Sequence, residues 1–373
     1  MDFDRSEDQK LLAKTVADFA KKESTVERFR KLRNADGEGF ERSTWKQMAE
    51  LGWLSVPFAE ELGGFGGSSV DVGLVLEELG KSLVPEPYLA SVVLAGAAIR
   101  LAGSVEQQAE LLEPLLEGDQ VLALAYAERG ARYATSRLST TAEADGSGWV
   151  IRGEKVFVLA GHAAERFVVS AEVAGEPGLF VVDADAAGVE RATVGLIDGR
   201  RGANLRFDGA RARMRLEAAP AAEVLEHVMD LAAAAAVAEG VGVCHAMLQM
   251  TVEYLKTREQ FGAKIGSFQA LQHRAVDMFV EMELLRSIAL EAVGRADATG
   301  EGKAARQAAI SAAKLQLATG GAFIARQAIQ LHGGIGVTDE HDVGLYFKRL
   351  HALMSLFGDE AFHARRYAQL QRG

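Results

Sequence analysis

The sequence predicts a mainly α-helical protein with a β domain in its middle. Three observations lead to this fold class. Apolar residues recur at helical spacing over residues 1–120, the spacing shifts towards every second residue over 121–219, and long helical patterns return over 220–373. Because 373 residues are long for one hydrophobic core, we expect two or three packed subdomains, and the pattern divides the chain into three.

The N-terminal region is expected to be helical, with Trp45 in its core. A glycine-rich break, ELGGFGGSS, separates the first helices from a further helix over Val70–Leu83, which ends before Pro85. Glu77 and Glu78 are expected on the solvated face of that helix. The first helical pattern is carried by Leu11, Leu12, Val16, Phe19 and Ala20.

The middle region is expected to form an antiparallel sheet or barrel, because its apolar runs are short and glycine-rich turns separate them. The turn signals are ADGSG, AGEPG and IDGRRG. The expected strands are Val121–Ala127, Leu138–Ala144, Trp149–Val158, Phe167–Val173, Leu179–Val182 and Leu205–Phe207.

The C-terminal region is expected to form an antiparallel four-helix bundle, because four long helical patterns are joined by short connections. The connections are REQFGAKIG, TGEG and HGGIGVTDE. The expected helices are 221–258, 268–299, 303–331 and 341–370.

Composition and charge exclude several classes of partner. Apolar residues make up 49% of the chain and charged residues 25%, as in soluble globular proteins. The net charge of −11 repels nucleic acid and anionic membranes. We expect no membrane span, because the longest apolar stretch, Leu231–Ala238, is too short. One cysteine, Cys244, and no metal-ligand spacing exclude a disulfide framework and a metal centre. The opening MDFDRSEDQK lacks an apolar signal, so a cytoplasmic protein is expected.

Three stretches carry a resemblance to a known family. They begin at Val56, Tyr254 and Gln330, and they read VPFAEELGGFGGSSVDVGLVLEELGKSLVPEP, YLKTREQFGAKIGSFQALQH and QLHGGIGVTDEHDVGLYFKRL. In this order they resemble the acyl-CoA dehydrogenase family. The family fold is an N-terminal helical domain, a β-barrel-like middle domain and a C-terminal four-helix bundle, which agrees with the predicted layout.

The resemblance implies FAD-dependent α,β-dehydrogenation of an acyl-CoA substrate. In this family a carboxylate removes the α-proton, and the β-hydrogen leaves as hydride to the flavin. FAD lies between subunits: the β domain of one chain holds the flavin ring, and bundle helices of its neighbour hold the pyrophosphate and adenosine. The implied electron acceptor is an electron-transfer flavoprotein.

The positions that reach a neighbour's FAD are present in this chain. Arg258 matches the family arginine that pairs with the pyrophosphate, a role that suits the planar guanidinium fork. The other matching positions are an aromatic, two polar residues and a glycine pair that lets backbone approach the ligand. They are Phe261, Gln269, Gln330, Gly333 and Gly334.

The positions that hold a chain's own flavin are changed. The family loop T-E-P-x-x-G-S-D corresponds here to AYAERGARYAT, in which Glu128 and Gly130 survive. Tyr133 and Ala134 occupy the serine and aspartate positions. The family stretch K-x-W-I-T corresponds to KVFVL, so Leu159 replaces a threonine and cannot donate a hydrogen bond to the flavin.

The catalytic carboxylate is also missing. The two family positions for this base fall at Phe357 and Ala232, and neither residue is an acid. Asp359 and Glu360 are weaker candidates for a relocated base; the simpler interpretation is a solvated helix terminus. We expect His332, inside the third motif, to be a structural hydrogen-bonding residue.

These losses and retentions predict a subunit that works with a second family member. The degraded positions act on the chain's own flavin, and the retained ones face a neighbour's. The pattern resembles the small subunits of bacterial heteromeric acyl-CoA dehydrogenases of the pimeloyl-CoA or steroid side-chain type, which form heterotetramers. Two alternatives remain: a self-sufficient homomeric dehydrogenase that uses Asp359 or Glu360, and a flavin-free structural relative.

Overall fold

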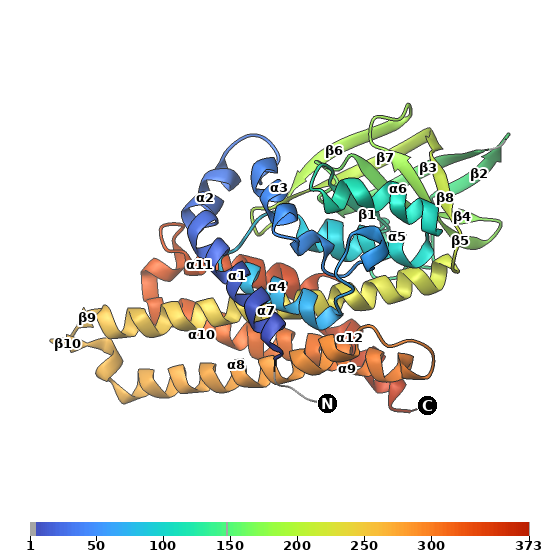
Figure 1. Cartoon of the computed structure of the whole chain (residues 1–373). Helices are drawn as coiled ribbons and strands as arrows, with labels where there is room; N and C mark the ends of the chain where they lie inside the picture. The colour runs from blue at the N-terminus through green and yellow to red at the C-terminus, as the bar shows by residue number, and fades with distance from the viewer. Residues whose placement is uncertain (1–4, 147, 373) are drawn as a thin grey trace. The chain divides into compact units, whose positions relative to one another are not determined.

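A computed structural model describes residues 5–146 and 148–372 (Figure 1). Its contacts divide the chain into two compact units. The first unit comprises Met1–Lys31, Ser69–Val84 and Ala233–Gly373, and the second comprises Leu32–Ser68 and Pro85–Ala232. The whole predicted β region therefore lies in the second unit, together with part of the N-terminal helical region.

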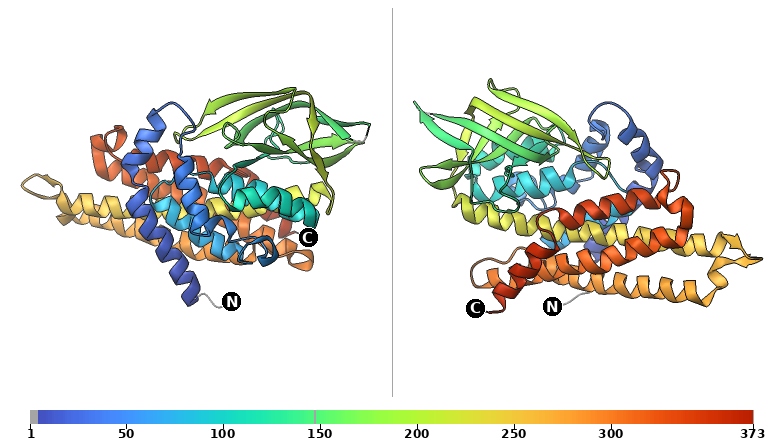
Figure 2. Two further views of the ribbon diagram at one scale, coloured as in Figure 1. Left: turned by 45° about the horizontal axis from the view of Figure 1, so that its top comes forward. Right: turned by 180° about the vertical axis from the view of Figure 1, so that it is seen from behind.

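The first unit is built from helices. Figures 1 and 2 show α7 and α8 running side by side and joined at one end by the hairpin of β9 (Glu259–Gln260) and β10 (Ala263–Lys264). The helices of this unit are α1 (Glu7–Glu23), α4 (Ser69–Lys81), α8 (Gln269–Arg295), α9 (Lys303–Gln316), α10 (Ala322–His332), α11 (Val343–Ser355), α12 (Glu360–Leu370) and the C-terminal part of α7 (Ala221–Thr257).

Two glycines bring the backbones of α4 and α7 into contact. A Cβ atom added to Gly242 of α7 would lie 2.0 Å from the carbonyl oxygen of Glu77 in α4. A Cβ atom on Gly80 of α4 would lie 2.5 Å from the carbonyl oxygen of Glu239 in α7. Only glycine fits at such distances, so these two residues set how closely the helices pack.

The expected helix 341–370 is wrong as a single element, because the structure separates it into α11 and α12. Phe357 and Gly358 lie in the break with φ angles of 60° and 122°, outside the helical range. The buried Lys314 ammonium caps the end of α11. Its Nζ donates to the carbonyl oxygens of Leu353, Met354 and Leu356 at 2.7, 3.2 and 2.7 Å. The expected helix 303–331 is present as α9 and α10, joined by a π-helical turn over Leu317–Gly321.

The second unit contains the sheet. Within the described residues, eight strands form one mixed sheet in the order β6-β7-β3-β2-β4-β5-β8, and β1 also pairs with β4. The strands are β1 (Leu122–Ala125), β2 (Thr141–Asp145), β3 (Gly148–Leu159), β4 (Arg166–Val173), β5 (Glu176–Asp183), β6 (Val189–Gly195), β7 (Arg201–Ala212) and β8 (Met214–Leu216).

The sheet differs from the expectation in two respects. It is not wholly antiparallel, because β1 runs parallel to β4, from Leu122 opposite Arg166. All four residues of β1 are buried, as is usual for a parallel strand. The strands β6 and β8 were not expected, because β6 is mostly exposed and has no apolar alternation, and β8 has only three residues.

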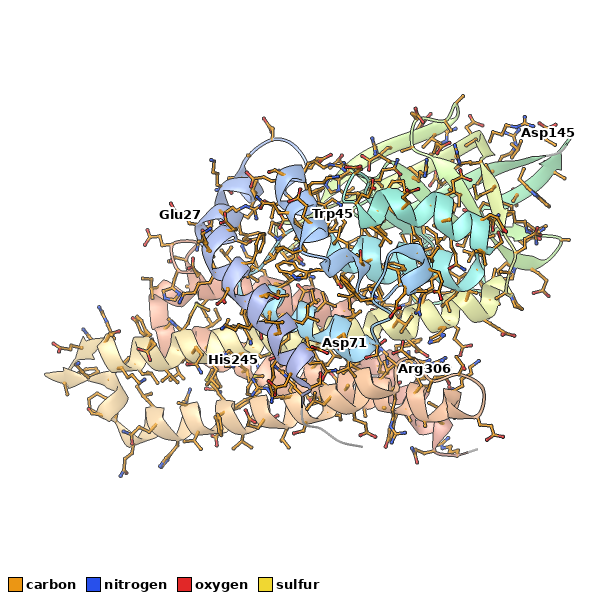
Figure 3. All side chains as sticks on the ribbon, viewed as in Figure 1. Glu27, Trp45, Asp71, Asp145, His245 and Arg306 are labelled. Carbon is orange, nitrogen blue, oxygen red and sulfur yellow. The ribbon has the colours of Figure 1, made fainter. Side chains whose placement is uncertain are left out.

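The helices of the second unit include α3 (Arg42–Glu50), α5 (Ala97–Ala102) and α6 (Val105–Leu116), and α2 (Val26–Asn34) contributes residues to both units. The expectation for Trp45 is confirmed: it is fully buried among these helices (Figure 3), and its indole N–H donates to the carbonyl oxygen of Gln120 at 3.2 Å.

The sequence predicted a solvated face for Glu77 and Glu78, and this prediction is wrong. Each is only 8% exposed. Arg5 donates to Glu77 at 3.2 Å, and Lys81 donates to Glu78 at 2.6 Å. Neighbouring cations from α4 and the N-terminal segment therefore compensate the burial of these carboxylates.

The prediction that every apolar stretch is too short to cross a membrane is wrong. Among the described residues, Ala221–Thr257 and Gly300–Val337 are long and apolar enough to cross a bilayer by length and composition. Their most apolar windows are 89% and 61% buried inside the protein. Core helices of globular proteins have this property.

We predict that Gly242→Ala strongly destabilises the chain. The new methyl group would clash with the backbone of α4 at 2.0 Å, and backbone on both sides cannot yield as a flexible side chain would. The expected loss is about 3 kcal/mol in the free energy of unfolding, measured by chemical denaturation. Gly195→Ala is the matched control, because nothing lies within 4 Å of its Cβ position. Equal stability of the two variants would contradict the close backbone contact.

Candidate functional site

A pocket of about 630 Å³ lies in the first unit, where α7 ends and α8 begins. It brings together four of the six residues expected to bind a cofactor. Arg258 comes from the end of α7, Gln330 from α10, and Gly333 and Gly334 from the loop that follows α10. Residues more than 70 positions apart in the sequence thus line one pocket.

This pocket, which we call the basic pocket, suits an anion. Its charged lining residues, among those described, are Arg258 and Arg274, without a carboxylate, although the chain as a whole carries a net charge of −11. No partner for the Arg258 side chain exists within the described residues, and it is exposed. Arg274 of α8 donates to Gln327 at 3.2 Å. Two guanidinium groups match the geometry and charge of a diphosphate.

The glycine pair leaves open space in the basic pocket. A Cβ atom on Gly333 or Gly334 would meet no protein atom within 4 Å. Gly333 has φ 63° and ψ −143°, a conformation that side chains other than hydrogen disfavour. The backbone here can therefore approach a ligand without an intervening side chain.

Phe261 and Gln269 do not line the basic pocket. Phe261 is 92% exposed at the tip of the β9–β10 hairpin, and its φ of 56° is followed by 75° at Gly262. Two consecutive left-handed residues form the tight turn of a two-residue hairpin and project the phenyl ring outwards. Gln269 is the exposed first residue of α8. Both side chains are exposed.

Two rings of the pocket lining, Tyr254 and His332, stack on each other, and the ring of His341 packs against both. The Tyr254 and His332 rings, which both line the pocket, have centroids 4.6 Å apart. His341 lies 4.4 Å beyond His332. The Nδ1–H of His332 donates to the carbonyl oxygen of Ala328 at 2.7 Å, so the expected structural role fits. Burial lowers the pKa of both histidines, and they are neutral near pH 7.

Sequence reasoning did not identify Tyr254, Arg274 or His341 as parts of this site. Tyr254 precedes Arg258 by one helical turn, a spacing that places both on the same face of α7. That spacing was available in the sequence. The position of His341 depends on how the loop after Gly334 folds back, for which no local signal exists.

In the second unit, the surviving Glu128 has a structural role. Its Oε1 accepts from the Lys155 ammonium at 2.6 Å, and its Oε2 accepts from the Ser139 N–H and hydroxyl, each at 2.6 Å. Burial raises the pKa of Glu128, but the hydrogen bonds from Lys155 and Ser139 outweigh it and hold the pKa at about 2. Burial lowers the pKa of Lys155 to about 8. This pair anchors the loop that follows β1.

The altered flavin positions lie on this loop and on β3. Phe157 is 49% exposed, with φ 57°, at a bulge in β3, and its N–H donates to the Asn204 side chain at 3.0 Å. Leu159 is the last residue of β3 and is half-buried. A second pocket, of about 500 Å³, lies beside the loop and mixes Arg129 and Arg137 with Glu172 and Glu176, so it has no single sign of charge.

Both positions predicted for the family's catalytic base are buried. Phe357 is 6% exposed and Ala232 is fully buried. The Asp359 Oδ1 accepts the N–H of Phe362 at 2.8 Å and caps α12, and Glu360 is exposed in the first turn of that helix. Asp359 and Glu360 therefore have the geometry of a helix N-terminus, the simpler of the two interpretations.

Comparison with known proteins assigns the family. The chain matches "Acyl-CoA dehydrogenase, N-terminal domain" over residues 6–119, the middle domain over 123–209 and the C-terminal domain over 222–370. The chain belongs to the acyl-CoA dehydrogenase family, as the three motifs and the helix–β–helix layout predicted. FAD is the cofactor of this family.

Individual relatives are similar over almost their full length. The probable acyl-CoA dehydrogenase YngJ of Bacillus subtilis is 31% identical over 365 residues, covering 92% of this chain and 92% of YngJ. A variant of the Tcur3481–Tcur3483 steroid ACAD is 30% identical with a TM-score of 0.88, covering 98% of both chains. The ChsE4–ChsE5 complex from Mycobacterium tuberculosis is 29% identical with a TM-score of 0.88, covering 100% of this chain and 99% of the other.

We predict that Glu128→Gln destabilises the chain by about 3–5 kcal/mol at pH 7, because it leaves the Lys155 ammonium buried without its carboxylate. Glu176→Gln, an exposed change beside the same loop, is the control and should stay within about 0.5 kcal/mol of wild type.

The effect of Glu128→Gln should also depend on pH. Without the carboxylate, the pKa of Lys155 falls further below its wild-type value of about 8 and the unfolded value of 10.5. In the folded variant Lys155 then loses its proton at a lower pH than in the folded wild type. The stability of the variant therefore starts to rise at a lower pH. The stability difference should therefore narrow from pH 6 to pH 8 in denaturation experiments. A difference that stays constant over this range would contradict the ion pair.

Proposed function

We propose that this chain is the non-catalytic subunit of an FAD-dependent acyl-CoA dehydrogenase and completes the FAD site of a catalytic partner, a second family member, in a heterotetramer. The observation that carries the proposal is a contrast between two sites. The basic pocket retains an unpaired Arg258 and an open glycine backbone, whereas buried Phe357 and Ala232 occupy the positions of the chain's own base.

The residues of the basic pocket fit the diphosphate part of FAD. Arg258 and Arg274 supply the positive charge, and Gly333 and Gly334 let main-chain groups approach the ligand. When bound, FAD supplies the hydride acceptor of the reaction. The contribution of this chain is to bind and orient the cofactor. The partner supplies the carboxylate, holds the acyl-CoA and contacts the flavin ring.

Exposed apolar residues next to the basic pocket support a subunit partner. Val276, Phe279, Val280 and Leu284 of α8 are each at least 50% exposed. Phe261, on the hairpin, is 92% exposed. Exposed apolar groups in such numbers are typical of protein interfaces. Among the similar solved structures, ChsE4–ChsE5 is a complex of two proteins and Tcur3481–Tcur3483 is a steroid ACAD, which favours a heteromer and a steroid-type acyl-CoA. An electron-transfer flavoprotein as acceptor and a cytoplasmic location belong to the same proposal.

We predict that the chain purified alone binds little FAD and has negligible dehydrogenase activity, and that co-expression with its partner yields a yellow, active complex. The measurements are flavin absorbance per subunit and turnover of an acyl-CoA. A chain that retains stoichiometric FAD and normal turnover on its own would favour the homomeric alternative. A complex that forms without FAD would favour the flavin-free relative.

In the complex, Arg258→Ala should weaken FAD binding by about 1.5–3 kcal/mol, the contribution of a charge-assisted hydrogen bond. Gly334→Ala should also weaken it, because its methyl group would enter the open space of the pocket without meeting protein. Lys256→Ala is the control: it removes an exposed cation two residues from Arg258 that pairs with Glu253 outside the pocket. FAD affinity is measured by titrating the apo complex. Unchanged FAD affinity in both pocket variants would mean that Arg258 and Gly334 have only a structural role.

The double variant Asp359→Asn with Glu360→Gln separates the proposal from a relocated base. We expect the complex to keep its activity, because Asn still caps α12 and neither carboxylate acts in catalysis. Turnover of the purified complex is the measurement. A loss of activity by several orders of magnitude, at unchanged thermal stability, would restore Asp359 or Glu360 as the base.

A further inference from the structure

The loop that carries Gly333 and Gly334 is open around these two glycines. This glycine loop, residues 333–342, joins α10 to α11 and contains one short turn of helix over Gly333–Val337. Open space surrounds the Cβ positions of both glycines, and Gly333 has a backbone conformation with a positive φ. The backbone at these two glycines therefore depends on contacts made elsewhere in the loop to keep one conformation.

Arg30 of α2 holds the far end of the glycine loop. Its Nε and Nη2 donate to the same carboxylate oxygen of Asp342 at 3.1 and 2.9 Å. Its Nη1 donates to the carbonyl oxygen of Asp339 and lies 3.5 Å from the Asp339 carboxylate. Figure 1 shows α2 beside the segment that precedes α11. One guanidinium therefore ties two loop residues, three positions apart, to a helix more than 300 residues away in sequence.

The contact restrains backbone as well as side chains, although the carboxylates of Asp342 and Asp339 are 42% and 56% exposed. The Arg30 side chain is 20% exposed, and all three of its nitrogens are used. A backbone carbonyl is one of the acceptors, so the interaction restrains the main chain and not only a mobile side chain. The planar fork of arginine can bind two acceptors in fixed directions, whereas a lysine ammonium cannot reproduce that geometry.

A continuous set of contacts connects Arg30 to the basic pocket. His341 lies between Asp339 and Asp342, and its Nδ1 accepts the N–H of Val343 at 3.1 Å. The His341 ring packs on His332, with centroids 4.4 Å apart. His332 lines the pocket and directly precedes the glycine pair. Movement of residues 339–342 would therefore shift the His332 ring, which lines the pocket, and the backbone at Gly333 that follows it.

We infer that Arg30 is a positioning residue of the basic pocket: it fixes the glycine loop in the conformation that receives the diphosphate. The inference rests on the proposed function, in which the pocket binds the FAD of the partner subunit. Arg30 touches no ligand itself and acts through Asp339, Asp342 and the ring stack.

The test compares Arg30→Gln, Arg30→Lys and Lys31→Gln in the co-expressed complex. Lys31 is the neighbouring exposed cation, and it makes no contact with the glycine loop within the described residues. Hydrogen–deuterium exchange of residues 333–342 reports loop order without any ligand, and titration of the apo complex with FAD reports the pocket. Arg30→Gln should speed exchange in the loop by about tenfold and weaken FAD binding by about three- to thirtyfold, with Arg30→Lys intermediate and Lys31→Gln like wild type.

Each outcome decides the inference. Loop exchange like that of Lys31→Gln would overturn it, and so would faster exchange with unchanged FAD affinity, because Arg30 would then be a structural contact only. If Arg30→Gln does not fold, Arg30→Lys, which retains the charge, is compared with Lys31→Gln in its place by the same two measurements. Arg258→Ala separates the two proposals. If it weakens FAD binding and Arg30→Gln does not, only the role of Arg30 fails; if Arg258→Ala has no effect, the proposed function fails.

Discussion

A buried ion pair fixes the position of α7 relative to α11 in the helical unit. Glu239 lies in the middle of α7, the helix that ends at the pocket beside Arg258, and Arg349 lies on α11, the helix that follows the glycine loop. The guanidinium binds the carboxylate through two parallel bonds of 2.7 and 2.5 Å, and both side chains are at most 6% exposed. Losing either partner would leave a buried charge, so α7 and α11 keep one relative position. The close contact between α4 and α7 at Gly80 also involves the backbone of Glu239, so both interactions restrain the same part of α7.

A second buried cation fixes the corner between α11 and α12. Burial lowers the pKa of Lys314 to about 7, and nearby Asp359 partly opposes this effect. Three carbonyl oxygens surround its Nζ, and His363 packs against the same corner with a hydrogen bond to the carbonyl oxygen of Phe357 at 3.2 Å. The corner, where the sequence comparison predicted the family's catalytic acid, is closed by the ring of Phe357, 6% exposed, and by hydrogen-bonded backbone.

The sequence predicted most of what depends on neighbours along the chain. Helical spacing located the helices, and two short motifs located Arg258 and the glycine pair, because each motif folds into one helix end or one turn. Contacts between distant residues were not predictable in this way. The break at Phe357 depends on Lys314, the burial of Glu77 depends on Arg5, and the support of the glycine loop depends on Arg30. The parallel pairing of β1 with β4 likewise depends on chain topology and not on local pattern.

Some charged side chains of this chain have a partner in the folded structure that explains their presence, and Arg258 does not. Glu128, Lys155, Glu239 and Arg349 are buried, and each has its charged partner, so the folded chain accounts for all four. Arg258 has no such explanation: it is exposed, lies near a second arginine, and contributes no ion pair within the described residues. Like charges in one pocket repel each other, and an anion that enters the pocket reduces this repulsion. An arginine that the isolated chain does not need, beside a backbone left open to a ligand, is the physical reason to look for the function of this chain in the cofactor of another subunit.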